Sequence, residues 1–175
     1  MNALQKNQAL AQARAVFELQ TQAGFTLQST SSGHFAVQAA ENLTEADWSA
    51  LRAAAPLLLI TASRARRLGL EAGTQPVALP AGELSFTEFH AIIAGAGASP
   101  PSPGETPGFA AELLALVKRA GLLPAALLWS TPENESAFLL SQEALMAKLP
   151  VEVRMGEAAS LPIAGAENSQ LVSFR

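Results

Sequence analysis

Two histidines and two pairs of carboxylates are the side chains of this chain that could perform acid–base or metal chemistry. His34 and His90 could each act as a general base or as a metal ligand, since imidazole titrates near neutral pH. Carboxylate oxygens are the ligands that Mg²⁺ prefers. Two acidic pairs lie close enough in sequence to cooperate, Glu83 with Glu88 and Glu133 with Glu135.

An arginine cluster and a serine-rich segment are the next candidates. Arg64, Arg66 and Arg67 could clamp a phosphate, because the guanidinium group donates two parallel hydrogen bonds. Residues 29–32 (Ser-Thr-Ser-Ser) could supply a nucleophile, but no Ser/His/Asp order or nucleophile elbow accompanies them, and the segment is typical of a turn. For every group a plainer alternative is favoured: a structural role for the histidines, a solvated acidic turn for the carboxylates, solvation or ion pairing for the arginines, and a turn for residues 29–32. We therefore assign no catalytic, cofactor-binding or metal-binding residue from these patterns.

Composition limits the class of protein. The 175 residues suit a single domain, with 49% hydrophobic and 15% charged residues. The net charge of -4 argues against a nucleic-acid partner, and the absence of cysteine excludes disulfides and zinc-thiolate sites. The polar start of the chain has no long apolar run, so we expect neither a signal peptide nor a membrane span. A cytoplasmic location is the resulting expectation.

Hydrophobic spacing predicts the elements of the first half. The pattern indicates a helix over 2–20, followed by a hairpin of strands 25–28 and 35–38. A helix over 45–54, capped by Thr44, then leads to a buried strand over 57–60. A short helix follows, capped by Ser63 and closed by Gly69.

The second half repeats this alternation. It predicts a strand over 75–79 and a helix that begins at a Ser85–Glu88 capping box and runs to about 94. A further helix ends at Gly121, and strands over 125–129 and 137–140 follow it. The last predicted elements are a helix over 142–149 and a strand-like stretch over 170–174. Residues 95–108 are mostly Gly, Ala, Ser and Pro, which predicts a mobile segment. Alternating strands and helices predict an α/β (α+β layered) fold, a single domain whose sheet is covered by helices.

Four segments are similar to the motifs of one enzyme family. Residues 33–44 are similar to G-D-L-V-M-A-A-E-x-V-T, and residues 61–70 to T-x-x-R-x-x-R-L-G-L. Residues 84–88 resemble I-S-A-A-D, and 108–124 resemble G-H-T-E-A-A-x-D-L-A-x-x-A-G-L-x-P. These motifs belong to 3,4-dihydroxy-2-butanone-4-phosphate synthase, the magnesium-dependent lyase of riboflavin biosynthesis that acts on ribulose 5-phosphate. The resemblance covers most of residues 10–150 and implies the family's fold.

The departures from the family fall on its chemistry. Serine, threonine, glycine and histidine at 29–34 replace the acidic R-E-N-E-G-D loop that holds magnesium. Other replacements are Phe109-Ala110 for the metal-binding His-Thr pair, Thr106 and Phe89 for two arginines, and Ser130 for a glutamate. Because such groups act as a unit, the resemblance implies a domain without the family reaction and without a bound cofactor.

The end of the chain carries a second resemblance. Residues 159–162 and 170–175 are similar to the opening of GTP cyclohydrolase II, which is fused to the synthase in many bacteria. This implies a synthase-like domain over 1–150, then a linker and the possible start of a cyclohydrolase domain over 151–175. Family members form homodimers, so the resemblance also implies a homodimer.

Three hypotheses follow for function. The leading one is a catalytically silent synthase-like domain with an assembly or regulatory role beside GTP cyclohydrolase II. The second is an enzyme with a rebuilt site, which predicts that His34, Glu88 and residues 29–32 converge. The third is a sensor that binds a phosphorylated sugar or a nucleotide through Arg64, Arg66 or Arg67.

Overall fold

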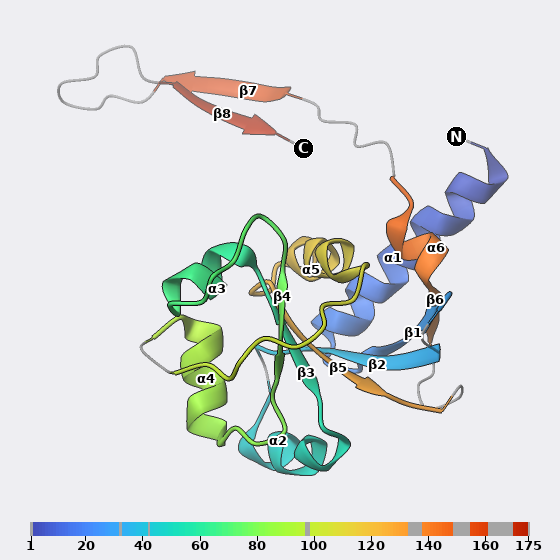
Figure 1. Cartoon of the computed structure of the whole chain (residues 1–175). Coiled ribbons are helices and arrows are strands. Elements are labelled where there is room, and N and C mark those ends of the chain that lie inside the picture. The colour runs from blue at the N-terminus through green and yellow to red at the C-terminus, as the bar shows by residue number, and fades with distance from the viewer. Residues whose placement is uncertain are drawn as a thin grey trace.

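A six-stranded mixed sheet forms the centre of the molecule, with strand order β4-β3-β5-β2-β1-β6 (Figure 1). The computed structural model describes the chain except for residues 1, 32, 42, 97–98, 133–137, 149–154, 161–169 and 175, and it describes 155–160 and 170–174 by their backbone alone. The strands are β1 (Phe25–Ser29), β2 (Gly33–Ala39), β3 (Leu57–Ile60), β4 (Val77–Pro80), β5 (Ala125–Ser130) and β6 (Leu139–Ser141). This is the α/β fold class that the sequence predicts.

Strand β5 holds the sheet together because it pairs with both β2 and β3. Both pairings are antiparallel, with Phe35 opposite Ser130 on one side and Leu57 opposite Leu128 on the other. The β1–β2 hairpin and the β3–β4 pair are antiparallel too, whereas β6 runs parallel to β1. The predicted hairpin is thus confirmed.

Helices cover both faces of the sheet. One hydrophobic cluster contains residues of α1, α5 and α6, and a second contains residues of α2, α3 and α4, so the two groups of helices lie on opposite faces (Figure 1). Their bounds are α1 (Ala3–Gln20), α2 (Glu45–Leu51) followed by the 3₁₀ turn η1 (Arg52–Ala54), α3 (Ala62–Arg67), α4 (Phe86–Ala94), α5 (Ala110–Arg119) and α6 (Gln142–Met146).

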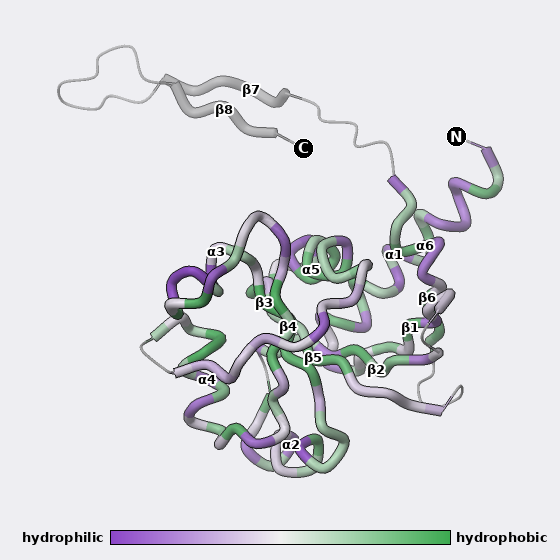
Figure 2. The backbone as a smooth tube through the Cα atoms, in the orientation of Figure 1, coloured by the Kyte–Doolittle hydropathy of each residue, from purple (hydrophilic) through white to green (hydrophobic). Residues whose placement is uncertain are grey.

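The central strands are apolar on both faces, which is why helices are needed on both. In β3, Leu59 belongs to the α1 side, while Leu58 and Ile60 belong to the α4 side. In β5, Leu128 packs on the α1 side and Leu127 on the α4 side. Figure 2 shows the resulting green, hydrophobic stretches at β3, β4 and β5. A run without alternation is expected of strands that are buried on both sides.

An aromatic pair anchors the α2 and α4 side. The rings of Trp48 and Phe89 stack with centroids 4.2 Å apart and planes at 17°. The indole Nε1 of Trp48 donates a hydrogen bond of 3.0 Å to the carbonyl oxygen of Leu84, so the buried polar atom is satisfied. This contact fixes α2 against the turn that leads into α4.

Helix caps follow the sequence at two of the predicted starts. Thr44 with Asp47, and Ser85 with Glu88, form complete capping boxes. The prediction that Ser63 caps the short helix is wrong. Thr61 is the cap, with its hydroxyl accepting from the amide of Arg64 at 3.3 Å, because α3 begins directly where β3 ends.

The remaining predictions hold with shifted ends. The predicted strand over 75–79 becomes β4, which starts at Val77 after a proline, and the helix expected over 142–149 ends at Met146. The predicted strand over 170–174 is present as β8 (Gln170–Phe174), and it pairs with β7 (Met155–Ser160), which the sequence pattern did not indicate. None of the described helices is both long and apolar enough to cross a membrane.

Part of the predicted mobile segment lies along the edge strand β4. The amide of Gly104 donates to the carbonyl oxygen of Ala78 at 2.9 Å, and the Ala78 amide donates to the Thr106 hydroxyl at 3.0 Å. These bonds satisfy backbone groups that an edge strand would otherwise expose. The mobility of residues 95–108 and the domain boundary at residue 150 stay predictions.

A buried glutamine joins the three helices on the α1 side. The Nε2 amide of Gln12, which is 3% exposed, donates to the carbonyl oxygens of Ala144 at 2.8 Å and Ala147 at 2.9 Å. Its Oε1 accepts from the Nη1 group of Arg119. One side chain of α1 thereby satisfies the end of α6 and holds the last turn of α5.

Replacing Gln12 by leucine should therefore lower the free energy of unfolding by about 1–3 kcal/mol, because buried carbonyls lose their donor. Urea denaturation followed by circular dichroism measures the change. Gln8→Leu is the matched control, since Gln8 is half-buried on the same helix and the structure shows no side-chain hydrogen bond for it. Equal stability of the two variants would contradict the proposed role of Gln12.

Candidate functional site

The structure brings together three positions at which the synthase resemblance places catalytic groups or their neighbours. Phe109 is the N-cap of α5, Phe35 lies on β2 next to the loop over 29–34, and Ser130 ends β5. The rings of Phe35 and Phe109 lie 5.9 Å apart at an angle of 56°, and Phe35 is the register partner of Ser130. Segments that are distant in sequence therefore meet at one end of the sheet.

The contact between the two phenylalanines is apolar. Phe109 is 3% exposed and belongs to the core cluster of the α1 side, against which Phe35 also packs. Ala110, at 1% exposure, offers a methyl group where the resemblance expects threonine. Neither phenylalanine has a lone pair for a metal ion. Among the residues that the structure describes, no group of three or more His, Asp or Glu could hold a metal ion.

Two other positions at which the resemblance expects an arginine lie elsewhere. Phe89 is buried on the opposite face of the sheet against Trp48. Thr106 accepts the amide of Ala78 on β4. Both side chains make structural contacts.

The hydroxyl groups of the β1–β2 turn bind the start of α6. The Ser29 hydroxyl donates to Oε1 of Gln142 at 2.9 Å, and the Thr30 amide donates to the same oxygen at 3.1 Å. This contact ties the turn to a helix that lies more than 100 residues further along the chain. Of the segment interpreted as a turn, Thr30 and Ser31 lie in the turn, Ser29 is the last residue of β1, and residue 32 lies outside the described residues.

The two histidines lie on different elements and share no contact. His34 on β2 accepts the Thr131 amide through its carbonyl oxygen at 3.1 Å, and its Nε2 is buried without a hydrogen-bond partner. His90 on α4 packs edge-on against Phe86, with ring centroids 4.4 Å apart, and its Nε2 is likewise buried and unpaired. Neither arrangement provides the orienting hydrogen bond that a catalytic imidazole uses.

Glu88 serves as a helix cap. Its Oε2 accepts from the amide and the hydroxyl of Ser85, at 2.8 Å and 2.6 Å. These hydrogen bonds favour the ionised form and lower the pKa of Glu88. Glu83 is exposed, and the predicted pair Glu133 and Glu135 lies outside the described residues.

The rebuilt site required His34, Glu88 and the 29–32 segment to converge. The Glu88 carboxylate bonds to Ser85 at the start of α4, and the Ser29 hydroxyl bonds to Gln142 at the start of α6, so these described side-chain contacts do not bring Glu88 to the 29–32 segment. The contacts therefore do not support this alternative.

The arginines of α3 have two different roles. Arg66 donates through Nη1 to the carbonyl oxygens of Ala72 and Gly73, which closes the loop that follows the helix. Arg64 is half-buried, and its Nη1 has no hydrogen-bond partner. Burial lowers the pKa of Arg64, the charge of Arg67 lowers it further, and the carboxylate of Glu41 acts in the opposite direction.

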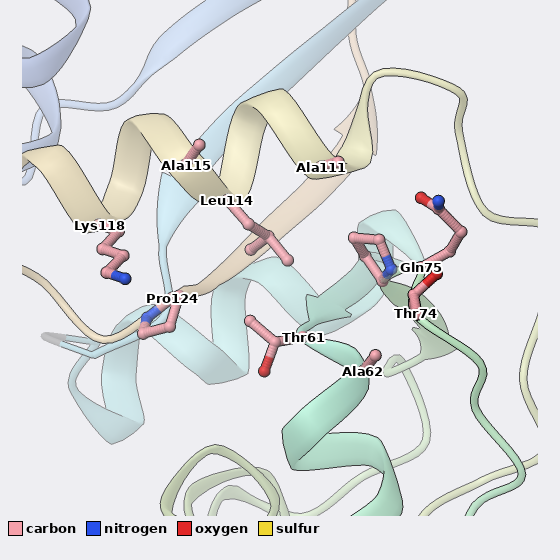
Figure 3. Close-up of a pocket in the computed structure, with 10 residues that line it drawn as sticks. Thr61, Ala62, Thr74, Gln75, Ala111, Leu114, Ala115, Lys118 and Pro124 are labelled. Carbon is pink, nitrogen blue, oxygen red and sulfur yellow. The ribbon is translucent and has the colours of Figure 1, made fainter.

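A pocket of about 480 Å³ lies between α5, the start of α3 and residues 74–76 (Figure 3). Sequence analysis missed it because its lining comes from separate segments that contain mostly alanine, threonine and proline. The four-residue spacing of Ala111 and Ala115 was the one signal available in the sequence, and the structure shows that both alanines are exposed on α5.

No protein-family model and no curated relative matches the chain by sequence. Solved structures do match by shape. The 3,4-dihydroxy-2-butanone 4-phosphate synthase of Candida albicans superposes with a TM-score of 0.52 at 12% identity, covering 76% of this chain and 94% of that one. A synthase in complex with two magnesium ions gives 0.53 at 10% identity, covering 78% and 94%.

A longer match extends into the end of the chain. RibBX, a two-domain 3,4-dihydroxy-2-butanone 4-phosphate synthase from A. baumannii, gives a TM-score of 0.52 at 14% identity, and the match covers 94% of this chain but 66% of RibBX. Identities this low establish the architecture alone. The chain therefore has the α/β fold of the 3,4-dihydroxy-2-butanone 4-phosphate synthases.

Proposed function

We propose that this chain is a synthase-like domain that does not carry out the synthase reaction and that serves assembly or regulation beside GTP cyclohydrolase II in riboflavin biosynthesis. The contact between Phe35 and Phe109 carries the proposal. It fills, with two aromatic rings, the end of the sheet at which the resemblance places metal ligands. A metal-assisted reaction needs a cation to polarise the substrate, and carboxylates are absent from this contact.

An exposed apolar surface supports the assembly role. Leu10 is 71% exposed and Phe17 is 53% exposed, and both lie on the outer side of α1. Leu10 and Phe17 are seven residues apart, which places them on the same face of the helix. Leu4, Leu139 and Met146 are also exposed, on α1 and on the elements β6 and α6 that α1 contacts. Exposed large apolar side chains that share a helix face are candidates for an interface with another protein.

The direct test is an assay for formate with ribulose 5-phosphate and Mg²⁺. The chain should release formate no faster than an enzyme-free blank, because no described cluster can bind the metal. An active synthase in the same buffer is the positive control. Formate release by the chain at an enzymatic rate would refute the proposal.

The Phe35–Phe109 contact should contribute to stability as an ordinary part of the core. Phe109→Ala should lower the free energy of unfolding by about 3–5 kcal/mol, the usual cost of removing a buried phenylalanine ring. Leu123→Ala is the control, because Leu123 is 39% exposed and lies after α5, outside the α1 surface, and it should lower stability clearly less than Phe109→Ala. Chemical denaturation measures both. A small loss in Phe109→Ala would show that the ring is not packed as described.

The assembly role predicts a homodimer that depends on α1. Sedimentation velocity should give a dimer for the parent chain and a monomer for Leu10→Gln. The glutamine would place a polar side chain where the proposed interface buries an apolar one. Leu123→Gln is the control, since Leu123 is 39% exposed and lies after α5. A monomeric parent chain, or an unchanged dimer in Leu10→Gln, would count against this surface.

A further inference from the structure

The pocket beside α5 has the size of a small-molecule site. Its volume of about 480 Å³ is within the range of roughly 300–1,000 Å³ that ligand pockets occupy. It extends along α5 from Ala111 to Lys118, seven residues apart, which corresponds to about 10 Å of helix. It lies on the flank of α5 and does not include Phe35 or Phe109.

The walls of the pocket are apolar and stiff. Leu114 is 4% exposed and lies on the side of α5 that faces the pocket, between the small side chains of Ala111 and Ala115 (Figure 3). Pro76 and Pro124 line the pocket from two other segments. Alanine leaves room above the helix, and proline fixes the backbone, so the shape exists before a ligand arrives.

Polar groups stand at both ends. Figure 3 shows Lys118 at one end, next to Pro124, and Thr74 and Gln75 at the other. Thr61 lies between them. Its oxygen accepts the Arg64 amide as a helix cap, which leaves the hydroxyl hydrogen free to be donated.

The charge around the pocket favours an anion. None of the described residues that line it is acidic, and Lys118 is its one charged group. In the described part of the chain, the one salt bridge is Arg14–Glu18, so Lys118 has no carboxylate partner there. The carboxylate of Glu41, near the Pro124 end, is already bonded to the Leu123 amide.

We propose that this pocket binds a small molecule with one anionic group and an apolar body about as long as the interval from Ala111 to Lys118. The anionic group, a carboxylate or a phosphate, pairs with the ammonium group of Lys118. The apolar body covers Leu114 and the two alanines, and a polar far end reaches Thr74 and Gln75. The site is independent of the proposed loss of synthase activity, because its lining does not include Phe35 or Phe109.

Two dyes that differ in one charge provide the test. 1-Anilinonaphthalene-8-sulfonate carries a sulfonate on an apolar body, and N-phenyl-1-naphthylamine is the same body without it. Fluorescence titration of the purified chain should show tighter binding of the sulfonate by roughly two- to fivefold, the effect of a partly exposed ion pair. Amide NMR shifts with the sulfonate should concentrate at Thr61, Thr74, Ala111 and Lys118.

Two variants and their controls make the outcome decisive. Lys118→Gln should abolish the preference for the sulfonate, whereas Lys6→Gln on the exposed side of α1 should keep it. Ala115→Leu should lower the affinity for both dyes by about fivefold or more, because the larger side chain fills part of the pocket. Ala13→Leu, at an exposed alanine of α1, should leave both affinities unchanged. Equal affinity for the two dyes, a preference that survives Lys118→Gln, or NMR shifts confined to α1 would each overturn the proposal.

Discussion

Burial of both faces of β3 and β5 is the constraint on which the rest of this structure depends. Each strand sends alternate side chains into a different hydrophobic cluster, so neither face can be left to water. The chain satisfies this with two layers of helices that come from different parts of the sequence. The α1 layer is further fixed by Gln12, which bonds to α6 and α5 at once.

The same constraint explains how the candidate site differs from the metal site that the sequence resemblance implies. Once Phe109 occupies the N-cap of α5, its ring has to be buried, and Phe35 on β2 supplies an aromatic surface within 5.9 Å. An apolar contact of this kind stabilises the packing of α5 on the sheet. The two rings themselves offer no ligand to a cation, so our proposal links the packing of α5 to the proposed absence of the synthase reaction.

Local signals in the sequence were sufficient for most of the fold. The run at 57–60 and the capping box at Ser85 fixed β3 and the start of α4, because strand burial and helix capping depend on nearby residues. The start of α3 was misplaced from Thr61 to Ser63, since both are good caps and the end of β3 decides between them. The residues of β7 show no alternation of apolar and polar side chains that would predict a strand.

The site was less predictable than the fold. Sequence similarity could indicate that Phe109 replaces a ligand, but not that Phe35 would pack against its ring, because that contact depends on the sheet register. The pocket at Lys118 depends on three separate segments and had no motif. The Phe35–Phe109 contact and the pocket both depend on residues that are far apart in sequence and close in space. Spacing along the chain does not show such neighbours.

Paramagnetic broadening by Mn²⁺ tests the central claim most directly. Mn²⁺ substitutes for Mg²⁺ at oxygen sites and broadens the amide NMR signals of residues close to it. The account predicts that millimolar Mn²⁺ leaves the signals of His34, Phe35, Phe109 and Ser130 no broader than those of exposed acidic surface residues. Stoichiometric, saturable broadening centred on these four residues would show that a cation binds where the two aromatic rings are described, and would contradict the account.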